Sequence, residues 1–209
     1  MKKKLTVDIL MFILMILEFS RVYTGALLHE IMGIILALLV IIHIVLNLNY
    51  IKNISQGSYN LKRIIMLIIN IMFIITFLLT IILGLLSSQE LLPFLNIHEL
   101  DINKLHKIVS YICLIIFGLH LGINFNAMFG KLSNTIKSKL LKVFIFIIIF
   151  TFGIYSIIDV ELISHLVGTY GFMNSDKFII IHILEYLSII LLISLSFNFI
   201  MKGITKNER

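Results

Sequence analysis

The sequence predicts an all-α membrane protein, a bundle of six transmembrane helices arranged as three helical hairpins in one domain, residues 1–209. Composition is the first observation behind this prediction. Of the residues, 60% are hydrophobic and 13% are charged, against roughly 45–50% and 25% in soluble domains. Mean hydropathy is +1.10. These values exclude a soluble enzyme and an independent nucleic-acid-binding domain, so the formal charge of +6 does not indicate a nucleic-acid partner.

The second observation is segment length, since a membrane span takes roughly 20 apolar residues. The first segment, residues 5–27, follows a lysine triplet as a signal peptide would, but it is too long and carries Glu18 and Arg21, so we expect a retained helix. Almost no chain separates it from the second, so a tight hairpin is expected around residues 24–28. The other predicted spans are 29–51, 62–87, 105–128, 138–160 and 177–201. The half-apolar connections 87–104 and 160–176 predict short helices on the outer surface.

The third observation is the distribution of charge between the connections. Lysine and arginine gather at the N-terminus, near residues 52–63 and 131–142, and at the C-terminus, whereas the alternate connections are acidic. The positive-inside rule therefore places both termini in the cytoplasm. Residue usage rich in Ile, Lys and Asn is typical of an AT-rich bacterial genome. We therefore expect a multi-pass protein of a bacterial-type cytoplasmic membrane, with lipid as its main partner.

An internal repeat relates the second and fourth predicted helices. LHEIMGIILALLVIIHIVLNLN, from Leu28, and LHKIVSYICLIIFGLHLGINFN, from Leu105, share seven of 22 positions at a shift of 77 residues. Two His and two Asn fall in register. His29 and His43 are 14 residues apart, as are His106 and His120, so each pair lies on one helix face with about 21 Å between its members.

The depths of these histidines predict two stacked sites. The two helices run parallel, so His29 lies level with His106 near the outer surface, and His43 with His120 nearer the inner one. A bare transition metal takes three or four protein ligands, and the sequence shows no acid or thiol near the inner pair. Haem supplies four nitrogens and requires only two axial imidazoles in an apolar slot. We therefore expect two non-covalent haem b groups, with these four histidines as the iron ligands.

Small and polar residues near the histidines admit two interpretations. Gly33 and Ser110, at equivalent positions one turn below the outer histidines, leave room for a flat macrocycle, as do Gly118 and Gly122 beside His120. Close helix packing explains them equally well. Asn47 and Asn124, one turn beyond the inner histidines, either hydrogen-bond to haem edges or backbone or are helix-end residues at the membrane interface, and we favour the second.

Five other positions carry weaker predictions. Arg21 either pairs with Glu18 or holds an outer haem propionate. His182, beside Glu185, is either a cofactor or proton-transfer residue or a structural hydrogen-bonding residue. The loop histidines, His98 and His165, are expected to be solvated, and the single cysteine, Cys113, to be an inert core thiol.

The motifs LHEIMG…HIVLNLN and LHKIVS…HLGINFN resemble the flavinylation-associated cytochrome family, within the general layout of di-haem b-type membrane cytochromes. The resemblance implies that His29, His43, His106 and His120 ligate haem. It also implies that electrons pass across the membrane to an extracytoplasmic protein carrying flavin. No nucleotide-binding domain accompanies the spans, so the donor is a membrane quinol or a cytoplasmic-side partner.

The predicted function is therefore electron relay, with any quinol-oxidising or surface-reductase activity belonging to a complex. Two other classes stay open. A transporter would use the intramembrane histidines for an ion, a proton or a small molecule. A cofactor-free structural subunit would tolerate their replacement.

Overall fold

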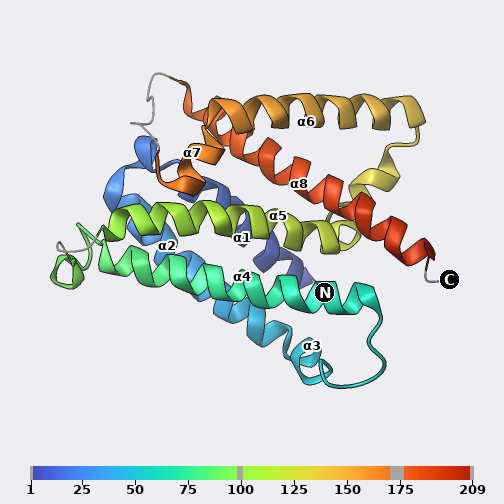
Figure 1. The fold of residues 1–209 in the computed structure, drawn as a ribbon, viewed down its shortest axis with the longest axis horizontal. Helices are drawn as coiled ribbons and strands as arrows, with labels where there is room; N and C mark the ends of the chain where they lie inside the picture. Colours follow the sequence, from blue (N-terminus) through green and yellow to red (C-terminus); the bar gives the residue numbers. More distant parts are fainter. Residues whose placement is uncertain (1, 98–100, 170–176, 208–209) are drawn as a thin grey trace.

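The computed structural model describes residues 2–97, 101–169 and 177–207 (Figure 1). Within that part of the chain the fold is entirely helical, as the composition predicts, with eight α-helices and one 3₁₀ turn. The helices are α1 Lys2–Glu18, α2 Arg21–Leu46, α3 Leu48–Lys52, α4 Leu61–Leu86, α5 Ile102–Thr135, α6 Lys139–Asp159, α7 Leu162–Val167 and α8 Ile179–Asn207.

Five of these helices are long and apolar enough to cross a membrane: α2, α4, α5, α6 and α8. The chain is thus a multi-pass membrane protein, and the second to sixth predicted spans are each represented. The first prediction, one helix over 5–27, is not confirmed. Helix α1 ends at Glu18 after 17 residues, and the chain turns at Phe19 and Ser20. Gly25, at φ +80°, then interrupts the start of α2. The hairpin turn therefore begins earlier than the uninterrupted hydropathy suggested.

Helices α1 and α2 form an antiparallel pair. Side-chain bonds join Lys4 to Asn47 and Asp8 to His43, and at the other end Glu18 reaches His29. Although α1 is short, it therefore accompanies α2 past both of its histidines.

The remaining long helices pack in an order that follows the chain. Helix α4 lies beside α5, α5 beside α8, and α8 beside α6 (Figure 1). Helix α2 lies mainly against α1, and its backbone is not packed closely on α5. The two histidine-bearing helices are thus held near each other by their partners rather than by direct backbone contact.

The most deeply buried apolar side chains lie on α5 and α8. Leu114, Tyr186, Ile189 and Ile190 are completely buried there, and Cys113 is buried as expected. Most side chains of α2, α4 and α6 face outward, and the exposed ones are predominantly Ile, Leu, Val and Phe. Such apolar surfaces require lipid around them.

The two long connections that were predicted to carry surface helices differ. The described residues between α4 and α5 hold only a 3₁₀ turn, Pro93–Leu95, rather than the predicted surface helix. This segment is fixed by Glu30 of α2, whose carboxylate accepts hydrogen bonds from the Ser88 hydroxyl (2.7 Å) and from backbone N–H groups of residues 89–91. The second connection contains the short helix α7, as predicted, which ends at Gly168 with φ +72°.

Candidate functional site

The outer histidines meet across the gap between α2 and α5. The ring centroids of His29 and His106 are 6.2 Å apart, and the ring planes are nearly perpendicular at 82°. An imidazole nitrogen lies about 2.0–2.1 Å from a bound transition metal, so imidazoles on opposite sides of one ion have centroids roughly 6 Å apart. The spacing of this pair therefore fits axial ligation of a single ion.

Each outer ring is oriented through Nδ1. In His29 this atom lies 2.7 Å from Oε2 of Glu18 and 3.1 Å from the Glu18 carbonyl oxygen. In His106 it lies 3.0 Å from the carbonyl oxygen of Thr80 in α4. Since these oxygens accept hydrogen bonds, Nδ1 carries the proton and the lone pair is on Nε2.

The inner histidines are oriented in the same way. Nδ1 of His43 lies 2.7 Å from Oδ1 of Asp8, and Nδ1 of His120 lies 2.9 Å from Oδ1 of Asn70. The two inner residues are near enough to interact electrostatically. The expectation of no acid around the inner pair was wrong. Asp8 is 35 residues from His43 in sequence and reaches it only because α1 folds back on α2.

The Nε2 atoms are available for a ligand in three of the four cases. Those of His29, His106 and His120 make no hydrogen bond within the described part of the chain. His43 differs, because the Asn47 amide nitrogen lies 3.4 Å from its Nε2. Bonding one ring nitrogen to oxygen while presenting the other is the usual arrangement of metal-ligating histidines.

The oxygen partners reveal that the repeat extends over two hairpins. Glu18 and Asp8 are ten residues apart on α1, and Thr80 and Asn70 are ten residues apart on α4. In both hairpins the first helix runs antiparallel to the second and holds its two histidines. The sequence comparison missed these partners, although isolated polar residues at equal spacing in apolar helices were the available signal.

The predicted small residues divide between two roles. Gly118 and Gly122 allow close packing on α8, because a Cβ would meet Ile193 at 2.9 Å and the Ser194 carbonyl at 2.8 Å. The Ser110 hydroxyl donates to the His106 carbonyl oxygen at 2.6 Å.

Gly33 faces α1, with the Glu18 carboxylate 3.7 Å from where a Cβ would lie. Gly84, which the sequence did not single out, lies against the site, since its Cβ would come within 3.1 Å of the His106 ring. Asn47 and Asn124 each donate to the carbonyl of the inner histidine one turn earlier. Asn47 ends α2, as favoured, whereas the helix-end interpretation is wrong for Asn124, which lies within α5.

Arg21 begins α2 beside the outer pair. No ion pair joins it to Glu18 in the described structure, because that carboxylate faces His29. Its charge acts instead on His106 and Lys107. Mutual pairing is therefore wrong, and Arg21 presents a cation near the outer site.

The remaining histidines lie in protein surroundings. His182 is buried, with Nε2 3.0 Å from the Phe19 carbonyl oxygen and Nδ1 3.8 Å from Oε2 of Glu185, which favours its structural interpretation. His165 is not solvated as expected. Its ring stacks on Tyr111 at 4.2 Å, and burial together with the Lys107 charge lowers its pKa to about 4. His98 lies outside the described residues.

A second polar cluster, absent from the sequence predictions, joins α6 and α8. Lys177 binds the carboxylates of Asp159 and Glu185, and these bonds raise its pKa although burial alone would lower it. Deeper in the bundle, the Ser188 hydroxyl donates to the Ser156 hydroxyl at 2.9 Å. The buried Glu185 side chain thus has a cationic partner within the protein, which it shares with Asp159.

The chemistry of the site rests on pairs of donors. Among the described residues, no three His, Cys, Asp or Glu side chains converge as a bare-metal site would require. Two imidazoles at each of two depths suit a cofactor that brings its other ligands with it. Searches of protein families, curated proteins and solved structures found no match to this chain.

Proposed function

We propose that this chain is a di-haem b-type membrane cytochrome. One haem lies between His29 and His106 and the other between His43 and His120. The observation that carries the proposal is the common orientation of these four rings, each with an oxygen on Nδ1. The centroid separation of the outer pair supports it further.

The residues of the chain hold and tune the site. When bound, haem iron supplies reversible one-electron redox chemistry. Glu18 and Asp8 place negative charge on one imidazole of each pair, which favours the more positive, oxidised form. Arg21 would bind a propionate at the outer site, because a guanidinium suits a carboxylate. The surrounding Ile and Leu side chains exclude water.

The stacking of the sites supports a path for electrons across the membrane. The histidines of one helix are separated by about 21 Å along its axis, so two haems at these depths would connect the two sides of a bilayer. With the positive-inside orientation, the inner site faces a quinol or cytoplasmic-side donor. The outer site faces an extracytoplasmic acceptor, which the family resemblance suggests is a flavin-bearing protein.

The test is a count of haem per chain in protein purified from haem-sufficient cells. We expect two haems b by pyridine haemochrome, falling to about one in His29→Ala and in His43→Ala, because one axial ligand is lost at one depth. His165→Ala is the matched control, since it also removes an imidazole from protein surroundings but should leave two haems. A colourless wild-type protein, with a control cytochrome loaded in the same cells, would overturn the proposal and favour transport.

A further inference from the structure

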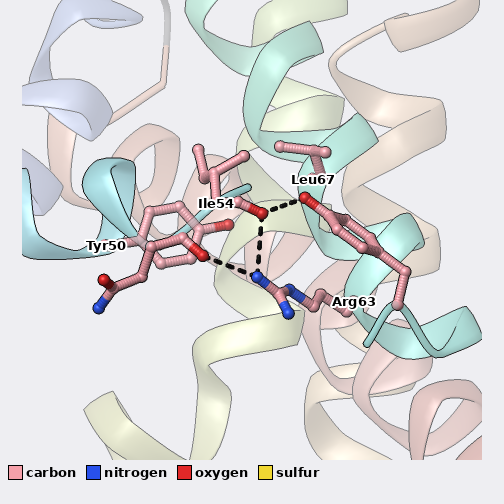
Figure 2. A pocket seen from close by; sticks show the side chains of 6 residues that line it. Tyr50, Ile54, Arg63 and Leu67 are labelled. Atoms are coloured by element: carbon pink, nitrogen blue, oxygen red, sulfur yellow. Dashed lines mark hydrogen bonds between the residues drawn. The ribbon is translucent and has the colours of Figure 1, made fainter. Parts of the chain in front are cut away.

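A small cavity lies at the end of the bundle that holds the inner histidines. Its volume is about 170 Å³, and it lies between α3 and the start of α4 (Figure 2). The lining residues are Tyr50, Asn53, Ile54, Tyr59, Arg63 and Leu67. Two aromatic rings, two aliphatic side chains and a guanidinium thus surround one opening, a combination typical of sites for small amphipathic ligands.

Arg63 holds the wall of this cavity in place. Its guanidinium donates to the backbone carbonyls of Asn53 (2.8 Å), Ile54 (3.0 Å) and Ser58 (3.2 Å), and it lies 4.4 Å from the centre of the Tyr59 ring. The Tyr59 hydroxyl also donates to the Ile54 carbonyl (Figure 2). The loop between α3 and α4 is therefore fixed by its own hydrogen bonds, and the cavity is preformed.

Hydrogen bonds connect the cavity to the inner site. The Asn70 amide nitrogen donates to the Tyr50 hydroxyl at 2.9 Å, and the Asn70 oxygen accepts from Nδ1 of His120 at 2.9 Å. Arg63, Leu67 and Asn70 lie at i, i+4 and i+7, on one face of α4. Within the described residues the Tyr50 hydroxyl donates to no acceptor, so its hydrogen is available to a ligand.

We propose that this cavity binds the headgroup of a hydroquinone that donates electrons to the inner site, an inference that rests on the proposed function. A cavity of about 150 Å³ holds one six-membered aromatic ring, and this one is only slightly larger. A flavin or a nicotinamide dinucleotide is far too large for it. Tyr50 would donate to a ring oxygen, while Ile54 and Leu67 supply the apolar wall that a methylated ring requires.

The reaction balances without a further reagent. One hydroquinone becomes one quinone and releases two electrons and two protons. The electrons would leave one at a time to two ferric haems, each of which would become ferrous, and the two protons would leave through the open mouth of the cavity to water. Because Asn70 bonds both Tyr50 and His120, the ring that is oxidised lies near a ligand of the inner iron.

The proposal is tested with a variant whose larger side chain fills the cavity. Leu67→Trp places an indole in it, and Leu78→Trp is the matched control, because Leu78 is exposed on the outer side of the same helix. Equilibrium dialysis measures the binding of duroquinone, a single methylated quinone ring, to the oxidised holoprotein, and anaerobic stopped-flow absorbance measures haem reduction by duroquinol. We expect Leu67→Trp to weaken binding and slow reduction about tenfold or more. Leu78→Trp should change neither, and dithionite should reduce all proteins equally.

A second, more conservative variant tests the same cavity if Leu67→Trp does not fold. Tyr50→Phe removes one hydroxyl and should weaken duroquinone binding by about three- to tenfold. Wild-type binding and rates in that variant, or in a folded Leu67→Trp, would overturn the cavity as the donor site. A protein without haem that still binds duroquinone in a Leu67-dependent way would refute the proposed function while leaving the binding site intact, so the two failures are distinguishable.

Discussion

Replacing Glu18 by Gln tests the site most directly, because it changes charge and little else. The carboxylate lies 2.7 Å from Nδ1 of His29, and its side chain is only 14% exposed. Glutamine keeps an oxygen that accepts the Nδ1 proton but carries no charge. The ring orientation should therefore persist while the negative charge near the outer iron disappears. We expect the reduction potential of one haem to rise.

The magnitude follows from the geometry. The distance from the carboxylate to the iron is the sum of the hydrogen bond, the width of the imidazole ring and an iron–nitrogen bond of about 2 Å. This sum is roughly 6–7 Å. At an effective dielectric constant of about 20, two unit charges at that distance interact by about 2.5 kcal/mol, which corresponds to about 100 mV for one electron. Asp8 is 35% exposed, so solvent screening should reduce the shift in Asp8→Asn to about half.

A spectroelectrochemical titration of the purified protein measures both potentials. Glu18→Gln should raise one of them and Asp8→Asn the other, with two haems retained in each variant. Glu161→Gln, which removes an exposed acid before α7, is the control and should change neither. Two unchanged potentials in Glu18→Gln, with both haems present, would refute the assignment of this carboxylate to an iron ligand.

Three further predictions use other parts of the fold. Gly84→Ala should displace the His106 ring and lower the haem content toward one per chain, although alanine in place of glycine usually stabilises a helix by about 0.5–1 kcal/mol. Gly203→Ala is the control, because a Cβ at Gly203 would meet nothing within 4 Å, and it should retain two haems. Glu30→Gln should weaken the charge-assisted bonds to the loop after α4, and faster cleavage of that loop by protease than in wild type would show it. His165 has a pKa of about 4 when folded, so the unfolded chain binds more protons below about pH 6.5. Stability should fall from there to pH 4, and thermal melts of His165→Phe should show a smaller decrease.

The features that depend on local chain properties were predictable from the sequence. Apolar runs of more than 20 residues predicted α2, α4, α5, α6 and α8, because lipid selects them by composition. Equal spacing of 14 residues between histidines on two helices predicted that His29 meets His106, and the structure brings these rings within 6.2 Å. Helical periodicity and the parallel direction of the two helices were enough for that result.

What could not be predicted depends on contacts distant in sequence. Hydropathy does not reveal that the chain turns at Ser20, because apolar residues continue on both sides of the break. The assignment of Glu18 to His29 rather than Arg21 also follows from that turn. The sequence predicts a solvated loop residue at His165, because nothing in the neighbouring residues indicates that α7 packs this ring against Tyr111.

The charges of the oxygen partners are distributed evenly between the two sites. Helix α1 supplies a carboxylate to each depth, and α4 supplies a neutral oxygen to each: Glu18 and Thr80 at the outer pair, Asp8 and Asn70 at the inner pair. An acid at such a depth is costly unless a positive charge faces it. A neutral imidazole does not provide that charge, whereas an oxidised iron between the two rings would. One carboxylate at each depth is thus the number that two stacked ferric haems would require, and the equal sharing of acids is itself an argument for two equivalent redox sites.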